Sequence, residues 1–211
     1  MAAPESTRPA AAPPPPGHVL AFEGLDQSGK QTQSERLAAG LRAAGRRVEF
    51  LTFPEYPTAI GTEIGRALHG ERDYAADTLQ LLYIANRYEF RPRIESWLAE
   101  GAIVICDRYV ASSIAYGEAQ GLDPAWLAEV QRYLPPPSLT LVLDIPPEVS
   151  LQRKHAARDR FERDLPLLAR VRDSYRRQAQ APGWVLIDGG RPVDEVAADV
   201  TRAVHARLAR P

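Results

Sequence analysis

The sequence predicts an α/β fold in which one five-stranded parallel sheet is flanked by helices. Short runs of apolar and β-branched residues alternate with helical patterns along the chain, which is typical of this class. Each run is almost continuously apolar, as expected for strands that are buried on both faces. The predicted strands are 19–23, 47–53, 102–106, 139–145 and 184–188.

Amphipathic helices are predicted between these strands, and Gly45 and Gly101 follow two of them as helix stops. The predicted helices are 29–44, 77–100, 124–133 and 193–209. Residues 146–181 contain further helical sequence, interrupted by the charged run RKHAARDRFERD. This run has too few apolar positions for a core element, so it predicts a basic lid at about 152–163.

The 211 residues, 45% of them hydrophobic and 25% charged, fit a single α/β domain. We expect this domain to span 18–211. Residues 1–17 are rich in proline and alanine and lack an apolar face, so they predict a disordered tail.

Charge and special residues exclude several classes of protein. The net charge of -1 gives no global reason to expect a nucleic acid or a membrane as partner, and no stretch approaches the roughly 18 apolar residues of a membrane span. The four histidines lack the spacing of zinc ligands. The only cysteine, Cys106, lies in an apolar run and suits a reducing compartment, so we expect a cytoplasmic protein.

A phosphate-binding loop is predicted directly after the first strand. The segment GLDQSGK matches the pattern G-x-x-x-x-G-K and opens a helix, whose N-terminus attracts anions. Glycines let backbone N–H groups approach a phosphate closely, and Lys30 would neutralise the β and γ oxygens of a triphosphate. The candidate nucleotide-binding residues are Gly24, Leu25, Asp26, Gln27, Ser28, Gly29, Lys30, Gln31 and Thr32.

One position departs from this pattern, because Gln31 stands where serine or threonine usually coordinates Mg²⁺. Thr32 points about 100° away on the helix and cannot simply replace that ligand. We therefore expect Mg²⁺ to be held largely through water and carboxylates.

Six segments occur in an order that resembles thymidylate kinase over residues 19–190. They are FEGLDQSGKQTQ, LTFPEY, LLYIANRYE, CDRYVASSIAY, LVLDIPPEVSLQR and RDRFERD. The resemblance implies a P-loop NTPase fold of the nucleoside-monophosphate kinase type. It also implies transfer of the γ-phosphate of ATP to dTMP with Mg²⁺, giving dTDP and ADP for dTTP synthesis, and a homodimer.

The segment Asp107-Arg108-Tyr109 follows the third predicted strand, where the carboxyl edge of a parallel sheet forms a ligand crevice. A carboxylate there can hold hydrated Mg²⁺, and an arginine can bridge two phosphates. The resemblance gives Asp107 and Arg108 similar roles. It also implies that Asp26 contacts the 3′-hydroxyl of the acceptor and neighbours the transferring group, although a helix-capping aspartate is the alternative.

Aromatic residues predict a site for a base. Tyr83 and Arg87 lie four residues apart on one helix, so they project from the same face. The resemblance implies that Tyr83 stacks on thymine and that Arg87 donates to its exocyclic oxygen. The alternative is a core tyrosine with an arginine at the helix rim. Tyr116 follows Tyr109 by almost two helical turns, which predicts rings on one side. By resemblance Tyr116 favours deoxyribose, with core packing as the alternative.

The resemblance extends to further residues at the acceptor site. Tyr56 stands at or near a position where many relatives have an arginine for the acceptor phosphate, so Arg108 is expected to carry more of that contact. The candidate dTMP-binding residues are Asp26, Phe53, Pro54, Tyr56, Tyr83, Arg87, Arg108, Ser112, Ser113, Tyr116 and Glu162.

The lid is the predicted source of a catalytic arginine, because Gln27 occupies the loop where some relatives carry one. The alternative is a solvated helix face. The candidate catalytic residues are Lys30, Arg108, Arg158, Arg160 and Asp26, and the candidate metal ligands are Asp107 and Asp26.

Two other functions stay open: a kinase for another (deoxy)nucleoside monophosphate, and an inactive nucleotide-binding regulator. The phosphate loop alone does not identify the base, and Gln31 and the missing loop arginine are the features that favour a regulator. A GTPase is excluded, because the chain lacks the N-K-x-D guanine motif.

Overall fold

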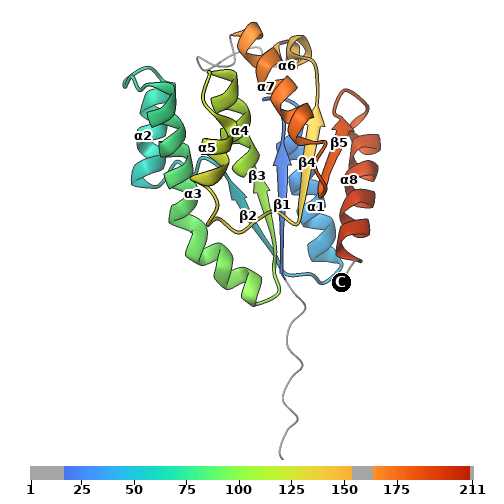
Figure 1. The fold of residues 1–211 in the computed structure, drawn as a ribbon. Helices are drawn as coiled ribbons and strands as arrows, with labels where there is room; N and C mark the ends of the chain where they lie inside the picture. Colours follow the sequence, from blue (N-terminus) through green and yellow to red (C-terminus); the bar gives the residue numbers. More distant parts are fainter. Residues whose placement is uncertain (1–16, 154–163, 210–211) are drawn as a thin grey trace, which may run out of the picture.

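The computed structural model describes residues 17–153 and 164–209. Five parallel strands form one sheet with the order β2-β3-β1-β4-β5 (Figure 1). Their bounds are β1 His18–Glu23, β2 Val48–Thr52, β3 Ile103–Asp107, β4 Leu139–Asp144 and β5 Trp184–Asp188. The predicted five-stranded parallel sheet is therefore confirmed. The predicted tail, except Gly17, and most of the predicted lid lie outside the described residues.

Eight helices are present in the described part of the chain. They are α1 Lys30–Ala43, α2 Ala59–Leu68, α3 Ala76–Ala99, α4 Val110–Ala119, α5 Pro124–Glu129, α6 Pro147–Arg153, α7 Leu165–Gln178 and α8 Val193–Leu208. None of these helices is long and apolar enough to cross a membrane.

The helix predicted at 124–133 ends earlier than expected, at Glu129, and turns with i→i+3 bonds follow up to the prolines at 135–137. Helices α2 and α4 are absent from the prediction. In α4 the buried positions are alanine, serine and glycine, and small residues on the buried side leave no apolar periodicity to detect.

Helices cover both faces of the sheet (Figure 1). One apolar cluster packs α1 and α8 against one face, through residues such as Leu37 and Val200. Two clusters on the other face pack α3, and α4 with α7, against the strands. Cys106 is fully buried there, and burial raises the pKa of its thiol, so the predicted buried cysteine is confirmed.

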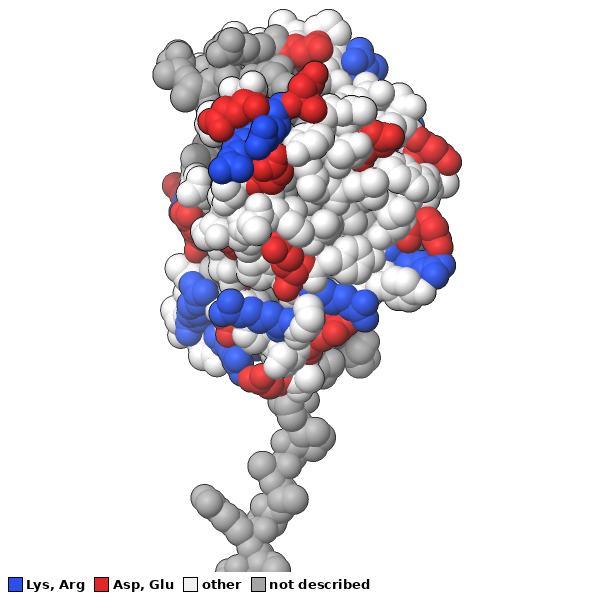
Figure 2. All heavy atoms as spheres, turned by 90° about the vertical axis from the view of Figure 1, so that its left-hand side faces the viewer, with Lys and Arg blue, Asp and Glu red and all other residues white. Residues whose placement is uncertain are grey.

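One side of the molecule has a central area with few charged side chains. Figure 2 shows this side, on which α2 and α3 lie, with a mostly uncharged area between charged groups near the top and the bottom. Leu81 on α3 is 43% exposed.

The turn that follows β1 packs directly on β4. Gly24 has a φ of 131°, and a Cβ at this position would lie 2.4 Å from the carbonyl oxygen of Leu143. Only glycine therefore fits between the two strands without moving backbone.

We expect Gly24→Ala to lower the free energy of unfolding by about 3 kcal/mol or more, because the φ angle and the backbone contact both oppose a side chain. Gly45→Ala is the matched control, since Gly45 also has a positive φ of 75° but has open space around its Cβ. It should cost only about 1 kcal/mol. Urea unfolding of both variants measures the difference, and equal losses would contradict the close contact.

Candidate active site

Two adjoining cavities open at the carboxyl edge of the sheet. The loop cavity surrounds residues 26–33 and also receives Asp107, and the α3 cavity lies against the side chains of α3 and α4. Five residues line both cavities: Asp26, Phe53, Pro54, Tyr56 and Arg108. Ligands bound in the two cavities would therefore meet at these shared residues.

The predicted phosphate loop connects β1 to α1. Gly29 precedes α1 with a φ of 97°, and Gln27 has a φ of 61°, so the loop turns sharply in the left-handed region. Among the described residues no side chain caps the N-terminus of α1, and residues 29–32 line the loop cavity. The N–H groups of the first helical turn can therefore bind an anion.

Lys30 lies under this loop and is only 6% exposed. Its Nζ donates to the carbonyl oxygen of Leu25 at 2.8 Å. Burial and, to a smaller extent, the charge of Arg108 lower the pKa of Lys30 to about 8, although the nearby carboxylates oppose both effects. A phosphate in the loop cavity would supply the negative charge that this ammonium group lacks.

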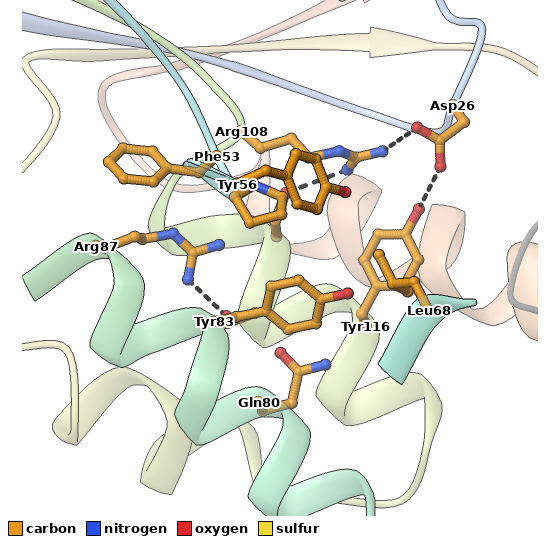
Figure 3. A pocket seen from close by; sticks show the side chains of 12 residues that line it. Asp26, Phe53, Tyr56, Leu68, Gln80, Tyr83, Arg87, Arg108 and Tyr116 are labelled. Carbon is orange, nitrogen blue, oxygen red and sulfur yellow. Dashed lines mark hydrogen bonds and ion pairs between the residues drawn. The ribbon is translucent and has the colours of Figure 1, made fainter. Parts of the chain in front are cut away.

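Arg108 forms an ion pair with Asp26 at the junction of the two cavities (Figure 3). Its Nη2 donates to Asp26 Oδ1 at 2.6 Å, and its guanidinium carbon lies 5.4 Å from the centre of the Tyr116 ring. Tyr116 donates to the other Asp26 oxygen at 3.4 Å. Burial opposes the charge of Arg108, but Asp26 raises its pKa well above the usual value. Arg108 therefore stays a cation.

The backbone of Arg108 is strained, with a φ of 65°. Such conformations are costly outside glycine and concentrate at functional sites. Here the turn between β3 and α4 directs the guanidinium toward Asp26 (Figure 3).

Asp107 ends β3 beside the phosphate loop and is 7% exposed. Its Oδ1 has no hydrogen-bond partner in the part of the chain that the structure describes. A buried carboxylate oxygen without a donor favours a ligand on that atom. The described residues contain no group of three metal-binding side chains, so a cation here would need other ligands as well.

The α3 cavity contains Tyr83 and Arg87, which project from one face of α3 as the spacing predicts (Figure 3). Arg87 is 2% exposed, and its Nη1 donates to Ser113 at 2.7 Å and to Gln131 at 3.4 Å. Its buried Nε has no partner within residues 17–153 and 164–209. Burial lowers the pKa of Arg87, and the charge of Glu23 is the largest effect that opposes it.

The expectation that the Tyr109 and Tyr116 rings share a side is wrong. Tyr109 precedes α4, which begins at Val110, so the two residues are not on one regular helix. The Tyr109 ring is fully buried 6.0 Å from Phe53, and its hydroxyl donates to the carbonyl of Pro135. Of these two tyrosines, Tyr116 lines the α3 cavity and Tyr109 does not.

Several residues at the cavities are absent from the sequence prediction. Gln80 lies three residues before Tyr83 on α3, so the helix spacing could have identified it, whereas Leu68 ends the unpredicted α2. Asn86 accepts from the N–H of Glu55 at 2.8 Å and donates to its carbonyl at 3.2 Å. It thereby fixes the segment between β2 and α2 that carries Tyr56.

Three predicted residues, Arg158, Arg160 and Glu162, lie outside the described residues. Arg153, at the end of α6, lines the loop cavity and donates to the carbonyls of Gln27 and Gly189, both at 3.1 Å. This arginine connects the phosphate loop to the segment after β5.

A phosphate loop between β1 and α1, joined to a second cavity with arginine and aromatic side chains, defines a P-loop nucleotide-binding protein of the nucleoside-monophosphate kinase type. The family model described as thymidylate kinase matches residues 22–200. The chain therefore belongs to the thymidylate kinase family, as the sequence resemblance predicts.

Similar proteins cover nearly the whole chain. The thymidylate kinase of Plasmodium falciparum is 32% identical over 189 residues, which cover 89% of this chain and 90% of that protein. A probable thymidylate kinase of Pyrobaculum calidifontis is 38% identical over 199 residues, covering 90% and 97%. The solved structure of thymidylate kinase from Candida albicans superposes with a TM-score of 0.78 at 28% identity and covers 92% and 93% of the two chains.

Proposed function

We propose that this protein transfers the γ-phosphate of ATP to dTMP, giving dTDP and ADP. The observation that carries the proposal is the pair of adjoining cavities that share Arg108, one at a phosphate loop and one at Tyr83 and Arg87. Membership of the thymidylate kinase family supports the same reaction.

ATP would occupy the loop cavity, with its phosphates against the predicted loop 24–32, of which residues 26–32 line the cavity. The N–H groups at the start of α1 bind phosphate oxygens, and Lys30 turns its Nζ from the Leu25 carbonyl to the β and γ oxygens. Arg153 and the segment at Gly189 lie at the other end of this cavity and border the nucleoside part.

dTMP would occupy the α3 cavity. Tyr83 stacks on the base and the unpaired Nε of Arg87 donates to it, while Ser113 keeps the other side of that guanidinium in place. The acceptor phosphate then reaches Arg108, which also lines the loop cavity. Asp26 and Tyr116 would contact the sugar. The rest of the cavity wall includes Phe53, Pro54, Tyr56 and Ser112.

The transfer needs no strong general base, because the attacking phosphate oxygen of dTMP is already anionic. Arg108 lies between two anions that repel each other, so it aligns them and neutralises charge. Lys30 stabilises the charge that develops on the donor phosphates.

We propose Mg²⁺ as the cofactor. The unpaired Oδ1 of Asp107 fits a water of a hydrated Mg²⁺, which usually binds through one or two carboxylates and substrate phosphates. Asp26 fits less well as a ligand, since its Oδ1 already pairs with Arg108. When bound, the ion would neutralise charge between the β and γ phosphates.

The lid arginines Arg158 and Arg160 stay our candidates for a further catalytic cation, with Glu162 at the acceptor. Support comes from the loop itself, where Gln27 is uncharged and exposed. An arginine over the γ-phosphate stabilises the equatorial oxygens during transfer.

We propose that residues 18–211 form one domain, since β1 and α8 pack into the same apolar cluster. The single buried cysteine supports a reducing, cytoplasmic setting.

We also propose a homodimer, which the mostly uncharged central area on the side of α2 and α3 supports (Figure 2).

The reaction is tested by steady-state formation of ADP with a panel of acceptors. We expect kcat/KM for dTMP to exceed that for dUMP by only about 10- to 200-fold, because the two differ by one methyl group. AMP and dCMP should react more slowly still. A preference for dCMP or AMP would assign the protein to another monophosphate, and ATP binding without turnover would indicate a regulator.

The affinity for ATP should fall as the pH rises above about 8, because only the charged form of Lys30 is attracted to phosphates. The pKa of about 8 in the free protein is raised on binding, so a proton is taken up at higher pH and Kd increases about tenfold per pH unit. Below about pH 7 Lys30 is already charged and this dependence disappears.

Titration calorimetry in two buffers of different ionisation enthalpy measures this proton uptake. Lys30→Arg is the matched control, since an arginine keeps its charge over the whole range and should abolish the slope. A Kd that stays constant up to about pH 9.5 in the unmodified protein would contradict the position of Lys30 at the phosphates.

The dimer is tested by sedimentation velocity, which should give twice the mass of the chain. Leu81→Arg is expected to shift the protein toward monomer, because a charge on the exposed face of α3 would be buried in the interface. Leu186→Arg on β5, where the leucine is 42% exposed, is the matched control and should leave the mass unchanged. A monomeric unmodified protein would refute the proposal.

A further inference from the structure

Glu23 is a buried carboxylate whose role neither the phosphate loop nor the acceptor cavity explains. It ends β1, directly before Gly24, and is 0% exposed. Neither cavity is lined by it. Burial of a charged carboxylate is costly, so its retention requires strong compensating contacts.

Three hydrogen bonds supply this compensation. Glu23 Oε1 accepts from the backbone N–H of Tyr109 at 2.8 Å, and Oε2 accepts from the hydroxyls of Ser112 at 2.6 Å and Tyr175 at 3.1 Å. The two hydroxyls also lie 2.9 Å apart. All of these partners are uncharged, and Glu23 has no ion pair among the described residues.

These contacts hold Arg108 at two points, its backbone and its guanidinium. Tyr109 follows Arg108 directly, so the bond from its N–H holds the turn in which Arg108 has its strained φ of 65°. Ser112 accepts from Arg108 Nη1 at 3.3 Å, and its own hydroxyl donates to Glu23. The carboxylate thus fixes both the backbone and the guanidinium of Arg108.

The charge of Glu23 also acts on the buried cations Lys30 and Arg87. Burial is the main cause of the low pKa of Lys30 and of Arg87, and Glu23 is among the groups that oppose it in both cases. The hydrogen-bond donors to Glu23 are all neutral, so none of them neutralises its negative charge.

We propose that Glu23, with Tyr175 of α7, is a positioning residue that holds Arg108 ready for the phosphate of the acceptor. This inference rests on the proposed function, in which Arg108 contacts that phosphate. Glu23 touches no substrate and acts only through the backbone of Tyr109, through Ser112 and through its charge.

The test compares the affinities of dTMP and thymidine, which differ only in the phosphate. The Kd of thymidine divided by the Kd of dTMP measures what the phosphate contributes to binding in each variant. We expect Glu23→Gln to reduce this ratio about tenfold, because the amide keeps the shape but removes the charge and one acceptor. A general disturbance of the cavity would weaken both ligands equally and leave the ratio unchanged.

Two neighbouring residues of α7 provide a matched pair in case Glu23→Gln folds poorly. Tyr175→Phe removes the hydroxyl that reaches Glu23 and should reduce the ratio about threefold. Ser174→Ala removes a buried hydroxyl that donates to Glu118 instead, and should leave the ratio unchanged. Thermal unfolding of each variant shows that the comparison is made between folded proteins.

Arg108→Ala distinguishes the role of Arg108 at the acceptor phosphate from the role of Glu23. A ratio that survives this substitution would refute the role of Arg108 itself, and with it the role of Glu23. A ratio that falls about 100-fold in Arg108→Ala but is unchanged in Glu23→Gln and Tyr175→Phe would overturn the inference on Glu23 alone.

Discussion

The site depends on keeping three cations, two buried and one partly buried, at the carboxyl edge of the sheet. Lys30, Arg87 and Arg108 all lie at cavities, and the first two are at most 6% exposed. Removing a charge from water costs several kcal/mol, and each cation offsets this differently. Arg108 pairs with Asp26, Lys30 donates to a carbonyl, and Arg87 donates to a hydroxyl and an amide. A phosphate or a base therefore meets donors that are already in place.

The strand order makes this arrangement possible. β1 and β3 are neighbours in the centre of the sheet, and Phe22 pairs with Asp107 in their register. The phosphate loop after β1 therefore lies next to the turn that contains Arg108, although 84 residues separate Arg108 from the carbonyl of Gly24 that it contacts. β2 lies on the other side of β3, so the segment from Phe53 reaches the same edge. No single element carries the site.

Local patterns predict the parts of this structure whose cause is local. The continuous apolar strands, the glycines and lysine of the phosphate loop, and the i,i+4 pair Tyr83 and Arg87 all follow from sequence spacing. Glu23 does not, because a glutamate at the end of an apolar strand gives no sign that three distant donors will converge on it. Asn86 is hidden for the same reason, and α4 because small residues form its buried side.

The acidic residue within the phosphate loop has a physical explanation in these contacts. An aspartate beside a triphosphate would repel it, but Asp26 neutralises Arg108 while no phosphate is present. An incoming phosphate must compete with that carboxylate, so the net gain is the difference between two ion pairs. The ring of Tyr116 and the hydroxyl of Ser112 contact the same guanidinium and do not carry charge. They can hold Arg108 in place while its ionic partner changes, which keeps the arginine aligned at the junction of the two cavities.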